Sequence, residues 1–241
     1  QYLIPDAGVS LIASLVIGFL VGGLLGALLE VTLIRRMYDR PLDTLLVTFG
    51  VGLILQQAAR DIFGAPAVRV VTPEWLGSGV EILGAVVPRT RIFIMLLAVT
   101  CVVAVAVTMK YTPVGRRIRA VVQHRDLAEA SGISSRATDI TTFFVGSGLA
   151  GVAGVALTLI GSTSSNTGMS YLVDAFLVVV IGGLGQIKGA VIAAVALGLL
   201  NSFIEYSTTA SVAKVAVFVI IVVFLQIRPQ GLFTVRSRSL V

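Results

Sequence analysis

Side chains that catalyse reactions or bind metals are scarce in this sequence, and they form no recognised catalytic set. The single histidine, His124, has no second metal ligand near it, and the single cysteine, Cys101, lies within an apolar run. A metal site needs several such ligands, and a lone buried cysteine most often packs as a small apolar side chain. No G-x-S-x-G motif marks a serine nucleophile. The sequence therefore predicts no catalytic residue, no metal site and no bound cofactor.

The glycine cluster at 182–189 invites comparison with a phosphate-binding loop. A Walker loop needs the spacing G-x-x-x-x-G-K-[ST] between a strand and a helix, so that backbone N–H groups and a lysine surround the phosphates. Here Lys188 is followed by Gly189, and no strand is predicted before the cluster. The chain is therefore not expected to bind ATP in this way, and ATP-driven work would require another subunit.

Uncharged polar residues inside apolar segments are the remaining candidates, because an unpaired polar group is costly to bury in lipid. The candidates are Thr48, Gln56, Gln57, Asn201 and the Thr141–Thr142 pair, and the first four are the candidates for a solute path. All are neutral, which suits a small uncharged or zwitterionic solute better than a cation. For each residue alone, a structural hydrogen bond between helices is an equally open interpretation. Glu30 lies near the end of its apolar segment, where we expect contact with water.

Residues 110–136 form the longest polar stretch, with six basic residues and only two acidic ones. Within it, Val114, Ile118, Val121 and Val122 recur at helical spacing, and the arginines lie off this stripe. The pattern predicts an amphipathic helix that lies at a membrane surface.

A second, shorter helix is predicted directly afterwards, over 126–132. Asp126 is expected to cap its start, and Glu129 to bond back to the cap as in a capping box. Gly132 suits the C′ position, where a left-handed backbone ends a helix. Leu127, Ala128 and Ser131 are expected on the face that a partner approaches, with Ala128 small enough to allow close contact. A short capped helix between two apolar segments is typical of a docking element for a soluble partner.

The composition is that of an integral membrane protein. Of 241 residues, 56% are hydrophobic and 12% are charged, whereas about a quarter of the residues in a soluble domain are charged. The net charge of +6 comes from basic residues that cluster in loops, which is a topology signal and does not indicate a nucleic-acid partner. The apolar segments leave no room for a soluble core, so we expect one transmembrane domain over 1–241.

The apolar segments that could cross a membrane lie at 9–34, 42–63, 92–109, 138–161, 190–204 and 212–227. The predicted fold is therefore all-α, a polytopic helical membrane protein. In the first segment, Gly18, Gly22 and Gly26 fall at every fourth position, which predicts a close helix–helix contact. In the long loop after the second segment, residues 68–71 and 81–87 could form short strands.

An apolar run at 172–181 is too short for a membrane span, which needs about 20 helical residues. The run either extends through the glycines, or is a broken or re-entrant element near 172–190, or ends in a hairpin turn between two ordinary spans. Broken backbone is tolerated at membrane depth only where protein or a cavity surrounds it, and it is common at transporter sites. The sequence leaves both interpretations open.

The distribution of lysine and arginine predicts the orientation in the membrane. Three, six and three basic residues lie in the loops at 35–41, 110–136 and 228–241, against three, none and none in the alternating loops at 64–91, 162–170 and 205–211. The first set is expected in the cytoplasm, which places the C-terminus inside and residue 1 outside. Because the chain begins at Gln1, we expect that a preceding span is missing from it.

Several segments resemble permease subunits of ABC importers. Asp126-Leu-Ala-x-x-x-Gly132 resembles the E-A-A-x-x-x-G loop of these permeases. Residues 178–190 resemble the I-G-G-x-G-S-x-x-G-A segment of the branched-chain amino acid permeases, and residues 228–233 resemble their R-P-x-G-L-F tail. Details that are closer to the urea branch of this family lie at 40–50, 55–57 and 171–176. The similarity covers essentially the whole chain.

The resemblance implies a permease subunit in the bacterial plasma membrane, most similar to the first permease of urea importers. It implies a homologous second permease, two cytoplasmic ATPases and an extracytoplasmic solute-binding protein as partners. In this family the loop is the coupling helix that docks on the ATPase, which gives that role to Arg125, Asp126, Ala128, Glu129 and Gly132. The sequence departs from the family at Gln186 and Lys188, and it lacks the family's N-terminal span.

Three classes of function stay open on the sequence. An ATP-driven importer of urea comes first, with a branched-chain amino acid or short amide importer as the alternative within that class. A passive solute channel is a different class, against which the docking helix argues because a channel needs none. A membrane enzyme is disfavoured because no acid, base or metal set is present.

Overall fold

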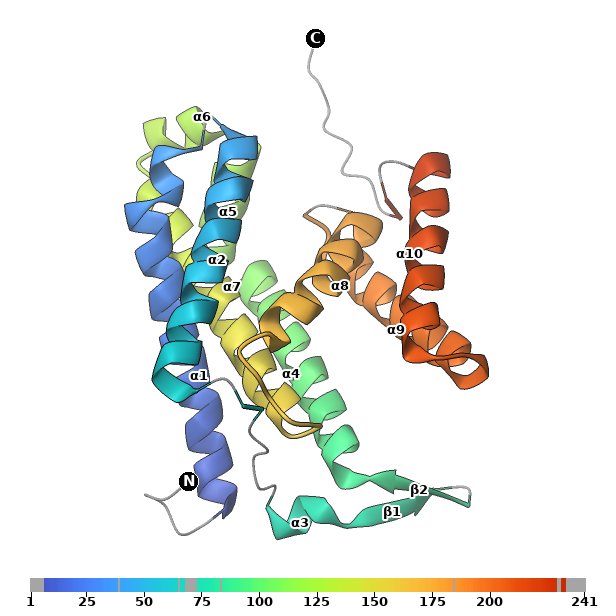
Figure 1. Ribbon diagram of the computed structural model, residues 1–241. Coiled ribbons are helices and arrows are strands. Elements are labelled where there is room, and N and C mark those ends of the chain that lie inside the picture. Colours follow the sequence, from blue (N-terminus) through green and yellow to red (C-terminus); the bar gives the residue numbers. More distant parts are fainter. Residues whose placement is uncertain are drawn as a thin grey trace. The chain divides into compact units, whose positions relative to one another are not determined.

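Long helices dominate the computed structural model of this protein (Figure 1). The structure describes residues 7–38, 40–64, 66–67, 73–82, 84–183, 185–228 and 231–232. Two compact units divide the chain, Gln1–Asn166 and Thr167–Val241. The expected strand at 68–71 and the tail at 233–241 lie outside the described residues.

Five helices in the described part of the chain are long and apolar enough to cross a bilayer. Lipid offers the backbone no hydrogen-bond partner, so a spanning segment must satisfy its N–H and C=O groups within a helix. The predicted all-α polytopic fold is thereby confirmed. These helices are α1 (Ala7–Thr32), α2 (Pro41–Phe63), α4 (Arg89–Tyr111) and α7 (Ser135–Thr158) in the first unit and α9 (Ile187–Ser207) in the second.

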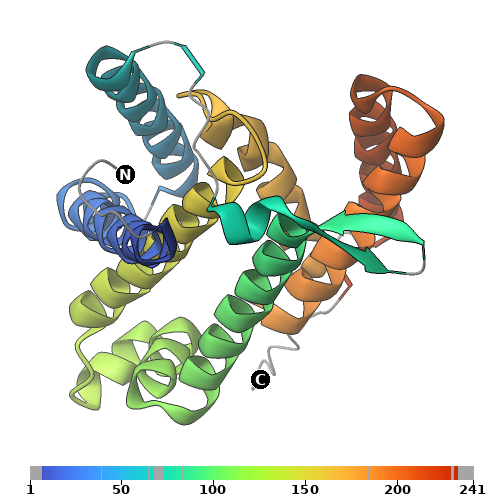
Figure 2. The same ribbon diagram turned by 90° about the horizontal axis from the view of Figure 1, so that it is seen from below.

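Helices α1 and α7 pack closely along a stripe of small residues (Figure 2). A Cβ atom added at Gly22 would lie 2.6 Å from the carbonyl oxygen of Ser147, and one at Gly18 would lie 2.8 Å from Cγ2 of Val155. Both distances are far shorter than a van der Waals contact, so glycine is what allows the two helices to approach. The close contact predicted from the glycine spacing is confirmed.

A two-stranded antiparallel sheet lies at one end of the first unit (Figure 1). The residues expected to form a strand at 81–87 make most of this hairpin. Leu76 is buried against Leu11 and Leu159, which anchors the segment before the hairpin to the ends of α1 and α7. The elements are α3 (Glu74–Gly77), β1 (Gly79–Ile82) and β2 (Ala85–Pro88).

The opposite end of the first unit carries two of the basic loops (Figure 1). The loops at 35–41 and 110–136 meet there, because the Arg125 guanidinium lies 4.8 Å from the centre of the Tyr38 ring. Their shared position agrees with the prediction that both lie on one side of the membrane. The short helices at this end are η1 (Ile34–Arg36), α5 (Pro113–Gln123) and α6 (Arg125–Ala130).

The second unit consists of α8 (Thr167–Gly182), α9 and α10 (Ala210–Ile227). Ile181, Ala193 and Ile221, one from each helix, form its buried core. The described part of the tail packs here too, since the N–H group of Leu232 donates to the carbonyl oxygen of Ile181 at 2.7 Å.

The glycine cluster forms the turn between α8 and α9. Gly183 and Gly185 have φ angles of 95° and 80°, a left-handed backbone that favours glycine. A turn between α8 and α9 fits both interpretations of the sequence, the broken element and the hairpin, so a broken or re-entrant element near 172–190 stays a prediction. The polar turn expected at 162–170 is shorter than predicted, because α8 begins at Thr167 and has 16 residues.

Candidate functional site

The amphipathic helix expected in the basic stretch is α5. The Thr112 hydroxyl caps its start by accepting a hydrogen bond from the N–H group of Gly115 at 3.4 Å. Pro113 occupies the first position, where its missing N–H group costs nothing. Val121 is buried and the three arginines of α5 are exposed, as predicted, whereas Val122 is 79% exposed and does not belong to the apolar face.

Helix α6 starts one residue earlier than predicted. Its first residue is Arg125, and the side chain of its N-cap residue, His124, makes no capping hydrogen bond. The prediction that Asp126 caps the helix, with Glu129 completing a capping box, is therefore wrong. An ion pair with Asp139 holds Arg125 against α7, which places residue 125 at the helix start.

Gly132 ends α6 in the predicted way. Its φ angle is 82°, and its N–H group donates to the carbonyl oxygen of Glu129 at 2.9 Å. The N–H group of Ile133 donates to the carbonyl oxygen of Ala128 at 2.9 Å. These two bonds make a Schellman motif, which needs a left-handed residue directly after the helix.

The face that α6 exposes agrees with the prediction at Leu127 and Ser131 and differs from it at Ala128. Ala128 is 5% exposed, because α6 packs with this face toward α5 and α7. Its expected place on the docking face is therefore wrong. Leu127 is 64% exposed, and the carboxylates of Asp126 and Glu129 are exposed beside it. A partner would meet one apolar side chain flanked by two negative charges.

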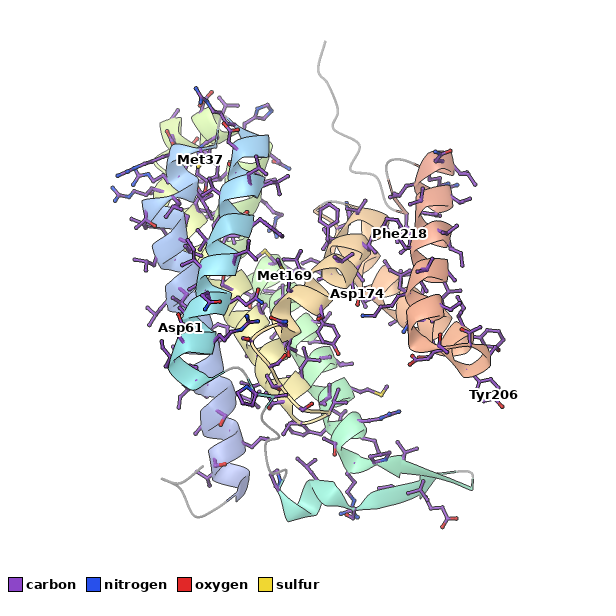
Figure 3. The ribbon with its side chains drawn as sticks, viewed as in Figure 1. Met37, Asp61, Met169, Asp174, Tyr206 and Phe218 are labelled. Atoms are coloured by element: carbon purple, nitrogen blue, oxygen red, sulfur yellow. The ribbon has the colours of Figure 1, made fainter. Side chains whose placement is uncertain are left out.

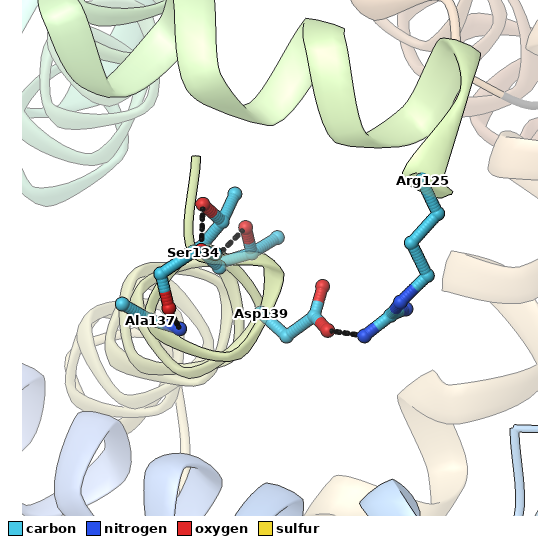
Figure 4. A network of polar contacts seen from close by, with 6 residues as sticks. Arg125, Ser134, Ala137 and Asp139 are labelled. Carbon is cyan, nitrogen blue, oxygen red and sulfur yellow. Dashed lines mark hydrogen bonds and ion pairs between the residues drawn. The ribbon is translucent and has the colours of Figure 1, made fainter. Parts of the chain in front are cut away.

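Arg125 makes an ion pair with Asp139 at this end of the unit (Figure 4). Its Nη2 atom lies 2.5 Å from Oδ2 of Asp139 in α7. Burial lowers the pKa of Arg125, but the hydrogen bond and the charge of Asp139 raise the pKa by more. Burial also raises the pKa of Tyr38 to about 12, and the negative charges of Asp139 and Glu30 add to this shift.

Glu30 in α1 lies fully inside the packed helices. Its exposed fraction is 0%, and neither carboxylate oxygen has a hydrogen-bond partner among the described residues. The expectation of contact with water is wrong, because α7 covers this part of α1. The Ser135 hydroxyl at the start of α7 is buried and unpaired as well. An unsatisfied buried polar group costs about 1–3 kcal/mol, so Glu30 is a costly residue to keep here.

Two of the predicted solute-path residues bond within their own helix. The Thr48 hydroxyl donates to the carbonyl oxygen of Thr44 at 2.8 Å. The side-chain amide of Gln57 donates to Asp61 at 2.8 Å, one turn further along α2, where Figure 3 labels Asp61. Asn201 lies half-buried on α9 of the second unit. Nothing in these contacts brings Thr48 or Gln57 into a shared site.

Gln56 belongs to a polar cluster that joins α2 to the turn before α8. Its side-chain amide donates to Oδ1 of Asn166. Nη2 of Arg60 donates to the same oxygen at 2.9 Å, and Nε of Arg60 donates to the Ser165 hydroxyl at 3.4 Å. The sequence reasoning missed Arg60, Ser165 and Asn166 as site residues. A basic side chain near the end of a span was the available signal for Arg60.

A cavity of about 390 Å³ lies between α5 and α7 beside the turn that follows α6. Arg117, Ser134, Thr138 and Thr141 are its polar lining residues. It offers one guanidinium and three hydroxyl groups, which do not make an acid–base or nucleophile set. Thr141, one of the polar residues that the sequence singled out inside the spans, lines it, whereas Thr48, Gln56, Gln57 and Asn201 do not.

Helices of spanning length and a helix break at a glycine turn define the class as a multi-pass helical membrane protein. The chain belongs to the family described as branched-chain amino acid transport system, permease component, which matches residues 2–226. No solved structure matches it.

Relatives with assigned names come from several bacteria. The high-affinity branched-chain amino acid transport system permease protein LivH of Salmonella typhimurium is 25% identical over 198 residues, 79% of this chain and 63% of LivH. BraD of Pseudomonas aeruginosa, whose description is the same, is 27% identical over 150 residues, 62% of this chain and 49% of BraD. The ribose import permease protein RbsC of Haemophilus influenzae is 33% identical over 101 residues, 39% of this chain and 31% of RbsC. The chain thus spans less than two thirds of the length of these relatives.

Proposed function

We propose that this chain is the membrane-spanning permease subunit of an ATP-driven importer of branched-chain amino acids. The family match over residues 2–226 is the observation that carries the proposal. LivH and BraD are both named for branched-chain amino acid transport, and urea is in neither name. Branched-chain amino acids, the alternative solutes considered in the sequence analysis, are therefore better supported than urea.

The assembly that we propose is that of an ABC importer. The chain would act as one permease domain with a homologous second permease, two cytoplasmic ATPases and an extracytoplasmic binding protein. The basic loops would face the cytoplasm of a bacterial cell, with the C-terminus inside the plasma membrane. The short helix α6 lies at this basic end and exposes Leu127, which supports it as the contact for the ATPase.

The Arg60 cluster supports a zwitterionic solute. Arginine has five N–H donors in a planar fork that matches a carboxylate. The bonds to Ser165 and Asn166 use Nε and Nη2, and Nη1 bonds to none of the described residues. Amino acids carry a carboxylate that this group could bind, whereas urea and ribose carry none.

The position of the cluster fits the direction of import. α2 begins beside the basic end and has 23 residues, which corresponds to about 34 Å at 1.5 Å per residue. Arg60 lies in its last turn. If α6 faces the cytoplasm, Arg60 lies on the outer side, where a binding protein would deliver the solute.

The decisive experiment is uptake in a strain that lacks this gene. Radiolabelled leucine, urea and ribose are compared before and after complementation with the gene. We expect complementation to restore leucine uptake only. Restored urea or ribose uptake without leucine uptake would overturn the proposed substrate class.

Energy dependence separates the importer from a passive channel. The complemented strain is compared with one whose partner ATPases carry a substituted Walker lysine. We expect the substitution to abolish uptake against a gradient. Full uptake in that strain would show that the chain conducts solute passively and would refute the importer.

A further inference from the structure

Arg125 is held from two sides at the basic end of the first unit. Nη2 lies 2.5 Å from Asp139 of α7, and the Tyr38 ring from the η1–α2 connection lies 4.8 Å from the guanidinium carbon. The Asp139 side chain is only 16% exposed, so solvent screens this ion pair weakly. The Arg40–Asp43 pair of α2 differs in both respects, with 3.9 Å between the charged atoms and side chains 78% and 50% exposed.

Asp139 is the centre of this contact. It accepts a hydrogen bond from Arg125, and the Tyr38 ring lies beside the same guanidinium. Burial raises the pKa of Tyr38 first, and the negative charge of Asp139 raises the pKa further. Three segments therefore meet at this ion pair: α6, α7 and the connection before α2.

Helix α7 is itself fixed to α1. The contacts at Gly18 and Gly22 leave no room even for a methyl group, so neither helix can slide past the other without a clash. Packed helices of this kind move as one body, because close-packed interiors shift between discrete arrangements and do not deform continuously.

Helix α6 is tied to this pair of helices at both of its ends. At its C-terminal end, the Schellman turn at Gly132 leads within three residues into α7. At its N-terminal end, the tie is Arg125 on Asp139. The buried side chain of Ala128 lies between the two ties. A force applied to the exposed face of α6 is therefore passed to α7.

We propose that Arg125, Asp139 and Tyr38 form a tether that makes α6 move together with the α1–α7 pair, so that they transmit ATP-driven displacement to the membrane helices. Arg125 acts here as a positioning residue inside the permease and not as a contact for the ATPase. The inference rests on the proposed function, in which α6 docks on an ATPase.

The first test measures coupling in the purified importer complex. Arg125→Gln and Asp139→Asn should leave the ATPases bound and hydrolysing ATP. Solute transported per ATP should fall several-fold, because the displacement of α6 would no longer be passed fully to α7. The exchange of the two charges, Arg125→Asp with Asp139→Arg, should restore part of the coupling because the pair forms again.

Matched controls come from the same end of the unit. Arg40→Gln and Asp43→Asn remove an exposed pair of the same chemistry and should leave transport per ATP unchanged. Asp139→Glu keeps the carboxylate and should retain most of the coupling, which separates loss of the tether from misfolding. Unchanged coupling in Arg125→Gln, or loss of the ATPases from that variant, would overturn the proposal.

The second test does not depend on transport. A spin label at Leu127→Cys, in a Cys101→Ala background, reports the motion of α6 in the full-length chain. Arg125→Gln should increase the mobility of the label, whereas Arg40→Gln should not. Equal mobility would refute the tether. Increased mobility in a protein that imports no amino acid would support the tether and refute the proposed function, so the two failures are distinguishable.

Discussion

Gly22 of α1 and Ser147 of α7 lie so close that a Cβ atom at position 22 would be 2.6 Å from the Ser147 carbonyl oxygen. Gly52 of α2 has no atom within 4 Å of the same added position. A side chain at position 22 would therefore clash with α7, whereas one at position 52 would meet open space, although both glycines lie in helices that could span a membrane.

The first prediction compares these two glycines. Gly22→Ala should destabilise the protein by about 1–3 kcal/mol, because an overpacked contact forces the helices apart. Gly52→Ala should be neutral or stabilising by up to about 1 kcal/mol, because alanine favours a helix over glycine. Thermal unfolding in detergent measures both. The same loss of stability in both variants would show that α1 and α7 are not in close contact.

The second prediction concerns the end of α6. Gly132→Val should leave membrane insertion intact and reduce both ATPase co-purification and amino acid uptake, because a β-branched residue resists a φ angle of 82°. The left-handed conformation costs a residue with a side chain roughly 1–2 kcal/mol. Gly132→Asn is the matched control, since asparagine tolerates this conformation and should keep most of the activity. Wild-type uptake in Gly132→Val would mean that the segment is only a loop.

The helices could be predicted because the two patterns that indicate them depend on residues close together in the sequence. A backbone in lipid must bond within its own helix, so the length of an apolar run sets each span. Glycines at every fourth position mark one face, and Gly18 and Gly22 do meet α7. The left-handed end of α6 was predictable for the same reason, since Gly132 suits the conformation that a helix end requires.

The rest depended on contacts between distant residues. The start of α6 follows from Arg125 bonding Asp139, 14 positions away, and no capping pattern contains that information. Arg60 and Asn166 are 106 positions apart, so their cluster cannot be read from spacing along one helix. Glu30 was expected in water because a span end is near, whereas the covering helix α7 decides its burial.

The third prediction tests the polar cluster at the end of α2. Arg60→Gln should raise the KM for leucine uptake by about 10- to 150-fold, because a charge-assisted hydrogen bond to a carboxylate contributes roughly 1.5–3 kcal/mol. Gln56→Leu should reduce uptake by leaving the Asn166 oxygen with fewer donors. Thr48→Val is the control, because that hydroxyl bonds to its own helix. An unchanged KM in Arg60→Gln would make the cluster a structural clamp between α2 and the turn.

The last prediction concerns the buried carboxyl group of Glu30. Replacing an unsatisfied buried polar group with an apolar side chain of similar size removes its desolvation cost, which is about 1–3 kcal/mol. Glu30→Met should therefore raise the unfolding temperature in detergent. A residue that lowers stability is retained when function needs it, so the same variant should lose uptake while it gains stability. Asp43→Asn, which alters an exposed carboxylate, should change neither quantity. A less stable Glu30→Met protein would show that the carboxyl group is satisfied in the membrane, and a more stable variant with full uptake would show that transport does not use it.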